Sequence, residues 1–166
     1  MRVVEIKDED CINYKKISMF IALPYCSGKC YKELGLDCSI CQNDALRKSP
    51  ILSVDDEKII ERYMSNHLTN AIVFGGLEPL DSFNELISFL DKLQNEHMCL
   101  DEIVIYTGYK IEEIKDKINI LKQFKNVILK VGRYIPNKPS IFDEILGVTL
   151  ASDNQYSIKL NEFDFC

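Results

Sequence analysis

Four of the seven cysteines lie within one short stretch, CSGKCYKELGLDCSICQN, which spans residues 26 to 43. Three residues separate Cys26 from Cys30, seven separate Cys30 from Cys38, and two separate Cys38 from Cys41. Thiolates are soft ligands that bind zinc or iron–sulfur clusters. The spacing therefore predicts a metal centre, although four-cysteine zinc sites usually place two short pairs about 15–20 residues apart.

Three interpretations of this stretch stay open. The first is a zinc site, and the second is a set of structural cysteines that simply pack together. The third is a 4Fe-4S cluster held by three thiolates, which leaves one iron open to an exchangeable ligand such as S-adenosylmethionine. If all four cysteines bind, that open position is lost, and the protein becomes an electron carrier or a structural iron–sulfur module.

The segments that flank the cysteines alternate between strand and helix patterns. Short apolar runs predict buried strands at 18–24, 70–76, 101–108 and 126–132, with further short strands near 145–151 and 156–160. Apolar residues at helical spacing predict amphipathic helices at 53–67, 82–97 and 110–124. Ser53 or Asp55 is expected to cap the first of these helices.

Strands that alternate with helices are typical of a parallel sheet with crossover helices. The predicted fold is therefore α/β, with a mostly parallel sheet in a single domain over residues 1–166. Ligands of such sheets bind beyond the carboxyl ends of the strands. The loops expected there are the cysteine loop at 24–43, Gly75-Gly76, Thr107-Gly108 and Gly132, so these loops should converge.

The bulk composition narrows the class of partner and the compartment. The net charge of −6 supplies no basic surplus to neutralise phosphates, so we expect no nucleic-acid partner. We also expect no membrane partner, because no apolar run is long enough to cross a membrane. The charged first ten residues do not resemble a signal peptide, and the longest apolar run, near 17–23, is too short to span a membrane. We therefore expect a cytoplasmic protein. This location and the odd number of cysteines both argue against a disulfide framework.

The motifs of the chain resemble those of the radical S-adenosylmethionine enzymes, and in particular the small activating enzymes of anaerobic ribonucleotide reductases. The usual family motif is Cys, three residues, Cys, two residues, Cys, often with Asn close behind. Cys26-Ser-Gly-Lys-Cys30 is similar to its first half, and Cys38-Ser-Ile-Cys41-Gln-Asn43 to its second half. The inserted residues 31–37, YKELGLD, depart from that pattern.

This resemblance implies a ligand set for the 4Fe-4S cluster. Cys26 and Cys30 match the first half of the motif, and Cys41 is the third expected ligand because Asn43 follows it. Cys38 is the alternative ligand. Cys11, Cys99 and Cys166 are isolated and are not expected to bind the cluster, and His67 and His97 lie near predicted helix C-termini, which explains them without catalysis.

Four further segments resemble cofactor-binding segments of the family: GGLEP at 75–79, IYTGY at 105–109, LKVGRY at 129–134 and ASDNQY at 151–156. The resemblance implies that S-adenosylmethionine contacts Gly75, Gly76, Glu78, Thr107, Gly108, Tyr109, Gly132 and Asn154. It also implies that Asn154 and Gln155 face either the pocket or the partner. The residue types suit this role, since glycine lets backbone approach a ligand and a carboxylate pairs with an ammonium group. Each segment also suits an ordinary strand-to-helix turn, in which Pro79 begins the helix.

The family implies a partial (βα) barrel of the radical S-adenosylmethionine type. It also implies an oxidoreductase that reductively cleaves S-adenosylmethionine and generates a glycyl radical. The substrate would be the catalytic subunit of an anaerobic ribonucleoside-triphosphate reductase or another glycyl-radical protein, and a flavodoxin-like or ferredoxin-like protein would supply electrons. The alternatives are a non-enzymatic iron–sulfur or zinc module, and a maturase of the same superfamily that acts on another substrate.

Overall fold

A six-stranded sheet forms the centre of the computed structural model, which describes residues 1–164. Its strand order is β10-β7-β6-β5-β3-β2. The strands are β2 (Glu5–Asp10), β3 (Ser18–Leu23), β5 (Ala71–Gly76), β6 (Glu102–Tyr106), β7 (Val127–Val131) and β10 (Tyr156–Lys159). The four central strands are parallel to one another, whereas β2 and β10 pair antiparallel at the two edges.

The central strands are parallel because a crossover connects each one to the next. Their side chains are apolar on both faces, as expected for a parallel sheet that is covered on both sides. In β7, for example, all five residues from Val127 to Val131 are buried. The parallel arrangement brings the carboxyl ends of β3, β5, β6 and β7 to one edge of the sheet.

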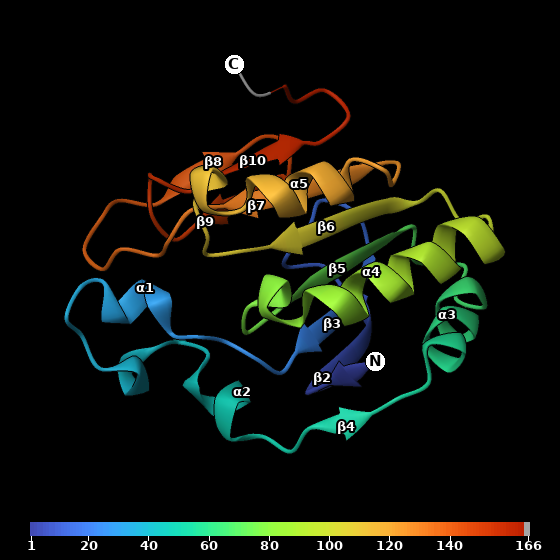
Figure 1. Cartoon of the computed structure of the whole chain (residues 1–166), viewed down its shortest axis with the longest axis horizontal. Coiled ribbons are helices and arrows are strands. Elements are labelled where there is room, and N and C mark those ends of the chain that lie inside the picture. The colour runs from blue at the N-terminus through green and yellow to red at the C-terminus, as the bar shows by residue number, and fades with distance from the viewer. Residues whose placement is uncertain (165–166) are drawn as a thin grey trace.

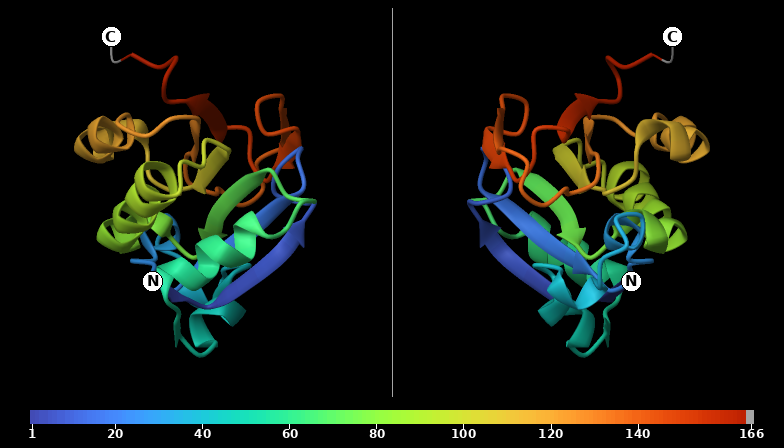
Figure 2. Two further views of the ribbon diagram at one scale, coloured as in Figure 1. Left: turned by 90° about the vertical axis from the view of Figure 1, so that its right-hand side faces the viewer. Right: turned by 90° about the vertical axis from the view of Figure 1, so that its left-hand side faces the viewer.

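Three helices cover one face of the sheet: α3 (Asp56–Met64), α4 (Phe83–Asp91) and α5 (Lys115–Leu121). Figure 2 shows α4 and α5 on the same side of the twisted sheet. The apolar residues of these helices pack against the strand residues on the same face of the sheet and form the larger core. Within it, the Phe74 and Phe89 rings meet edge to face, with centroids 5.6 Å apart. Burial of these apolar side chains favours folding through the hydrophobic effect.

A smaller core covers part of the opposite face. The strands β8 (Ile141–Asp143) and β9 (Val148–Leu150) form a hairpin, which contributes Leu146 and Leu150 to this core. Tyr14, from the loop after β2, also belongs to it. These residues pack on Val73 and Val104 of the sheet. The hairpin lies on the side away from α4 and α5 (Figure 2).

The cysteine loop leaves β3 and runs past the end of the sheet (Figure 1). It contains α1 (Lys29–Lys32), a 3-10 turn at Cys38–Ile40 and α2 (Asp44–Lys48). It then reaches the short strand β4 (Leu52–Ser53), which pairs with β1 (Arg2–Val3) before α3 begins. The loop is therefore tied at its start to β3 and at its end to the N-terminus.

The structure confirms the predicted parallel strands and the α/β class. Asp55, one of the two expected caps, does cap α3, since its side chain accepts a hydrogen bond from the Glu57 N–H at 3.2 Å. The charged edge strand β2, with sequence EIKDED, was not predicted because it has no apolar pattern. The segment near 145–151 was expected to hold a short strand, and β9 forms there but pairs with β8 outside the main sheet.

Two predicted helices are interrupted. The segment 82–97 follows a 3-10 turn at Pro79–Ser82 and consists of α4 and a π-helical turn at Lys92–Glu96. The segment 110–124 begins with a 3-10 turn at Ile111–Glu113 and continues as α5. Within residues 1–164 no helix combines the length and apolar character that a membrane span requires. The expectation about Cys166 lies outside the described residues.

The edge-to-face ring pair predicts which truncation will unfold the protein. Phe89→Ala should lower the free energy of unfolding by about 3–5 kcal/mol, because Phe89 is fully buried and its loss leaves a cavity against Phe74. Phe142→Ala is the control, since Phe142 is 61% exposed and its loss should change stability by only about 0.5 kcal/mol. Urea unfolding of both variants measures the difference, and equal effects would contradict the assignment of the core.

Candidate functional site

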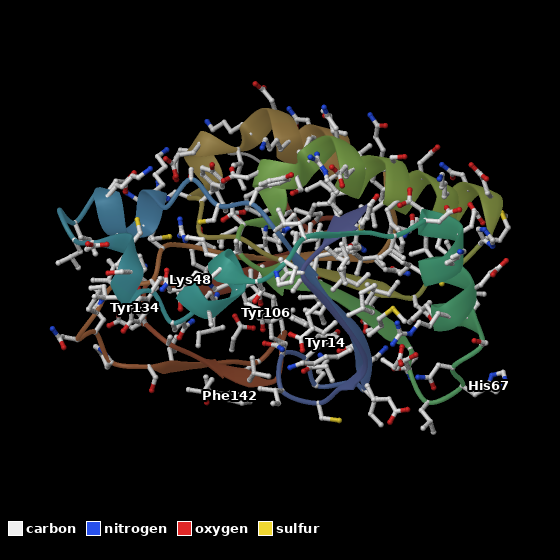
Figure 3. All side chains as sticks on the ribbon, turned by 90° about the horizontal axis from the view of Figure 1, so that it is seen from below. Tyr14, Lys48, His67, Tyr106, Tyr134 and Phe142 are labelled. Carbon is white, nitrogen blue, oxygen red and sulfur yellow. The ribbon has the colours of Figure 1, made fainter. Side chains whose placement is uncertain are left out.

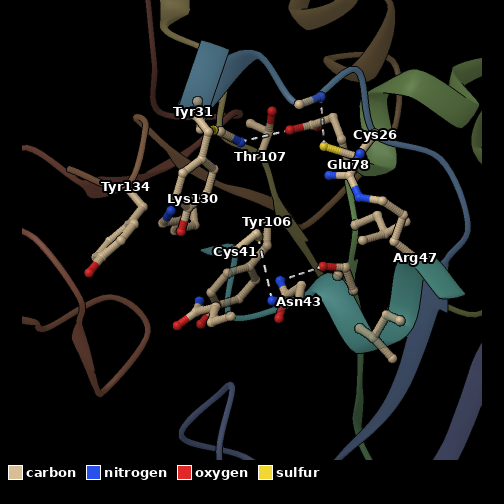
Figure 4. A pocket seen from close by; sticks show the side chains of 18 of the residues that line it. Cys26, Tyr31, Cys41, Asn43, Arg47, Glu78, Tyr106, Thr107, Lys130 and Tyr134 are labelled. Atoms are coloured by element: carbon tan, nitrogen blue, oxygen red, sulfur yellow. Dashed lines mark hydrogen bonds between the residues drawn. The ribbon is translucent and has the colours of Figure 1, made fainter. Parts of the chain in front are cut away.

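The loops at the carboxyl ends of the parallel strands surround a cavity of about 270 Å³. Figure 4 shows its side chains converging from β5, β6, β7 and the cysteine loop. The residues that line it include Cys26, Cys30, Cys41, Asn43, Gly75, Gly76, Glu78, Tyr106, Thr107, Gly108, Lys130, Gly132, Tyr134 and Gln155. The cavity therefore lies where the sequence predicted that the loops would converge.

The ladder between β3 and β5 continues beyond both strands and holds two of these loops together. The Leu77 N–H donates to the Leu23 carbonyl at 3.2 Å, and the Glu78 N–H donates to the Tyr25 carbonyl at 2.7 Å. The pairing thus extends to the residue before Cys26. From the far end of the loop, the side-chain amide of Asn43 donates to the Gly76 carbonyl at 2.7 Å.

The glycines at the cavity are required by close packing within the protein. A Cβ atom on Gly76 would lie 2.7 Å from the Ala22 Cβ and 2.8 Å from the Ala22 Cα, and the φ angle of Gly76 is +82°. A Cβ on Gly108 would lie 2.7 Å from the Cys30 Sγ. The sequence analysis explained these glycines by the close approach of a cofactor. The structure adds that the neighbouring strand and Cys30 already leave no room for a side chain at these positions.

Three of the four clustered cysteines face the cavity. Cys26, Cys30 and Cys41 line it, whereas Cys38 does not, and the Cys38 thiol lies 3.6 Å from the Gly28 carbonyl. Burial raises the pKa of the Cys26 and Cys30 thiols, with nearby Glu78 adding to the effect. The six cysteines among residues 1–164 are free thiols.

The donor set fits a 4Fe-4S cluster in kind, because three soft sulfur ligands share one partly enclosed cavity. Among the described residues, no three Cys, His, Asp or Glu side chains are already gathered as a metal-binding group. The two histidines lie elsewhere. Figure 3 places His67 at the end of the molecule opposite Tyr134, and the His97 Nε2 lies 2.7 Å from the Glu57 Oε2.

Glu78 is a buried carboxyl group with only 6% of its surface exposed. Its Oε1 accepts the Leu80 N–H at 3.1 Å, and its Oε2 accepts the Gly108 N–H at 2.8 Å. Glu78 thereby caps the 3-10 turn that begins at Pro79 and links the ends of β5 and β6. Burial raises the pKa of Glu78 to about 7, although these hydrogen bonds oppose the shift.

Two predicted contact residues lie differently from the expectation. The Tyr109 hydroxyl points away from the main cavity and donates to the Asp81 Oδ1 at 2.6 Å. Asn154 does not line the cavity, because its amide donates to the Arg133 carbonyl at 2.7 Å. The neighbouring Gln155 does line it, and its amide donates to the Gly132 carbonyl at 3.2 Å.

Lys130 is a cavity residue that the sequence interpretation missed. It is 7% exposed, and its Nζ lies 6.0 Å from the centre of the Tyr106 ring. Burial lowers the pKa of Lys130 to about 8. A signal was available in the sequence, because Lys130 is the one charged residue in the strand VILKV.

Arg133 is a second residue that the sequence interpretation missed, and it fixes the inserted part of the cysteine loop. Its guanidinium is 4% exposed and bonds to the Glu33 Oε1 at 2.7 Å, to Glu113 at 2.8 Å and to the Gly108 carbonyl at 2.8 Å. Lys29 also pairs with Glu113. These bonds join α1 to the ends of β6 and β7, so the insertion is anchored to the sheet.

A family model described as "4Fe-4S single cluster domain" matches residues 25–151. A probable dual-specificity RNA methyltransferase RlmN of Malacoplasma penetrans is 26% identical over 103 residues, which cover 55% of this chain. The match spans 29% of the length of that relative. No solved structure gives a significant match to the chain.

The orientation of the thiols predicts which cysteines hold iron. Cys26→Ala, Cys30→Ala and Cys41→Ala should each lose the reconstituted cluster, because each removes a sulfur from the cavity. Cys38→Ala is the matched control and should keep it, since Cys38 lies outside the cavity lining. Iron and sulfide content after anaerobic reconstitution measures the outcome. Cluster loss in Cys38→Ala with retention in Cys41→Ala would reverse the assignment.

The buried Glu78 carboxyl predicts a pH dependence of stability. Because its pKa is higher in the folded state, the folded protein binds a proton that the unfolded chain releases, so stability falls as pH rises from about 4.5 to about 7. A shift of this size corresponds to roughly 3 kcal/mol. Urea unfolding of the metal-free protein across this range should show the slope, and Glu78→Gln should remove Glu78's share of it. Glu61→Gln, an exposed control on α3, should follow the wild-type curve.

Proposed function

Because the chain belongs to the 4Fe-4S single cluster domain family, we propose that it is a radical S-adenosylmethionine activating enzyme. Its substrate is a glycine of an anaerobic ribonucleoside-triphosphate reductase or of another glycyl-radical protein. The family match and the RNA methyltransferase relative support the radical S-adenosylmethionine superfamily. The activating-enzyme subtype, a partial barrel over the single domain 1–166, a cytoplasmic location and a flavodoxin-like or ferredoxin-like reductant are parts of the proposal.

One observation carries the proposal: three thiols and a buried carboxyl group face the same cavity at the carboxyl ends of four parallel strands. Cys26, Cys30 and Cys41 would hold the cluster, and the carboxyl group of Glu78 would bind the ammonium group of S-adenosylmethionine. When bound, a 4Fe-4S cluster supplies the electron that cleaves S-adenosylmethionine to methionine and a 5′-deoxyadenosyl radical, which takes a hydrogen atom from the substrate.

The chain's own residues serve two purposes in this scheme. The continued β3–β5 ladder and the bond from Asn43 to Gly76 keep the sulfur ligands beside the glycine loop. Glu78 has both oxygens held by backbone N–H groups, so its remaining lone pairs have a fixed direction. A fixed acceptor costs little reorganisation when it binds a cation.

The surface beside the cavity favours a protein substrate. The cysteine loop exposes three large apolar side chains, with exposed fractions of 42% for Leu34 and 39% for Leu36, both in the insertion, and 59% for Ile40. Apolar side chains gathered next to a site are typical of surfaces that another protein covers. An anaerobic reductase that presents its glycine here would shield the cavity from solvent.

RNA methylation is a second candidate because of the Malacoplasma penetrans relative. The net charge of −6 weighs against it, since RNA binding requires a basic surface. A non-enzymatic iron–sulfur module is the remaining alternative, and Cys38 as a fourth ligand would favour it.

Product formation separates these functions. The reconstituted protein with reductant and S-adenosylmethionine should release 5′-deoxyadenosine, and a cognate reductase should raise the yield and acquire a glycyl radical. Chromatography and electron paramagnetic resonance measure the two results, with Cys30→Ala as the inactive control. A reducible cluster that never cleaves S-adenosylmethionine, even with reductase present, would leave the electron-carrier function in place of the enzyme.

A further inference from the structure

Lys130 is the one side chain of β7 that carries a charge into the cavity. Only 7% of its surface is exposed, and Figure 4 shows it among the side chains that line the cavity. An ammonium group withdrawn from water is costly unless a partner of opposite charge replaces the water. The partners that the protein itself supplies to Lys130 therefore decide whether this charge is structural.

The protein satisfies little of the bonding capacity of Lys130. Its Nζ can donate three hydrogen bonds, and it donates one, to the Gly132 carbonyl at 3.3 Å. No carboxylate among residues 1–164 forms an ion pair with it. By contrast, Arg133, three residues further along, is surrounded by Glu33 and Glu113. Arg133 thus has carboxylate partners, whereas Lys130 has no carboxylate partner among residues 1–164.

Glu78 does not take the place of that missing partner. It faces the same cavity, but its two oxygens accept backbone hydrogen bonds from Leu80 and Gly108. The cavity consequently holds two ionisable side chains, Glu78 and Lys130, that form no ion pair with each other. A ligand with an anionic group can satisfy Lys130 while the rest of the ligand fills the space beside Cys30.

We propose that Lys130 is an anion subsite of the cavity, which binds a carboxylate or phosphate group of the ligand held beside the cysteines. Two of the three N–H donors of Lys130 are available to that group. The Gln155 amide donates to the same Gly132 carbonyl as Lys130, so it lies beside the ammonium group. The anion has two sources: the methionyl carboxylate of S-adenosylmethionine, or an acidic group of a substrate. The first source rests on the proposed function, and the second does not.

The test compares wild type, Lys130→Met and Lys58→Met, all reconstituted anaerobically. Methionine keeps the length of the lysine stem and removes the charge, and Lys58 is an exposed control on α3. Isothermal titration calorimetry with S-adenosylmethionine, its decarboxylated analogue and inorganic phosphate separates the sources. Thermal unfolding should show Lys130→Met at least as stable as wild type, since an unpaired buried charge has been removed. Lys130→Gln gives the same comparison if Lys130→Met fails to fold.

If the cofactor supplies the anion, Lys130→Met should bind S-adenosylmethionine about tenfold or more weakly than wild type, as for other charge-assisted hydrogen bonds. Its affinity for the decarboxylated analogue should equal that of wild type. If a substrate supplies the anion, Lys130→Met should bind S-adenosylmethionine normally and lose phosphate binding. Lys58→Met should match wild type with every ligand.

Two results would separate or overturn the proposals. Wild type that binds phosphate through Lys130 but never binds S-adenosylmethionine would keep the anion subsite and contradict the proposed function. Equal binding of all three ligands by wild type and Lys130→Met, or a wild type that binds none of them, would overturn the subsite. A large loss of thermal stability in both Lys130 variants would instead assign Lys130 a structural role.

Discussion

The parallel pairing of β3 with β5 is the contact on which the site depends. The pairing aligns Ala22 with Gly75 and Leu23 with Gly76, and it continues through the backbone of Leu77 and Glu78. The cysteine loop and the glycine loop therefore leave the sheet already joined. Gly76 lies so close to Ala22 that a Cβ atom on residue 76 would not fit. The close approach of β3 and β5 therefore fixes the position of Cys26 at the start of the cysteine loop.

A second set of contacts adapts this arrangement to the insertion at 31–37. Seven extra residues between two pairs of cysteines would ordinarily loosen the loop, since longer loops cost more entropy to order. Arg133 offsets this tendency by gathering Glu33, Glu113 and the Gly108 carbonyl around one buried guanidinium. The insertion thereby becomes part of the rim of the cavity, and its outer apolar residues are left facing solvent.

The electrostatics of the cavity follow from how each charge is satisfied. Arg133 is neutralised by carboxylates, and Glu78 is held by backbone donors, so both have internal partners. Lys130 has a single carbonyl and an aromatic ring nearby. Ionisable groups whose pKa values are shifted by burial and by neighbouring charges cluster at functional sites. The unequal treatment of these three residues is what distinguishes the site from the remainder of the core.

The sequence by itself determined the α/β class, the four parallel strands and the clustering of thiols, because these depend on local apolar periodicity and on residue spacing. It also placed Gly75, Glu78 and Thr107 at strand ends, which is sufficient to bring them to one edge of a parallel sheet. The 3-10 turn at Pro79–Ser82, the π-helical turn at Lys92–Glu96, the edge strand β2 and the position of the β8–β9 hairpin depend on tertiary packing, which overrides weak local preferences.

Only the tertiary structure decided which side chains face the cavity. Neighbouring positions in a loop can point in opposite directions, so spacing could not show that Cys38 lies apart from Cys26, Cys30 and Cys41. The same holds for Gln155, which lines the cavity while Asn154 turns to the Arg133 carbonyl. Burial and pairing depend on residues distant in sequence, and these alone reveal that Lys130 has no carboxylate partner within residues 1–164.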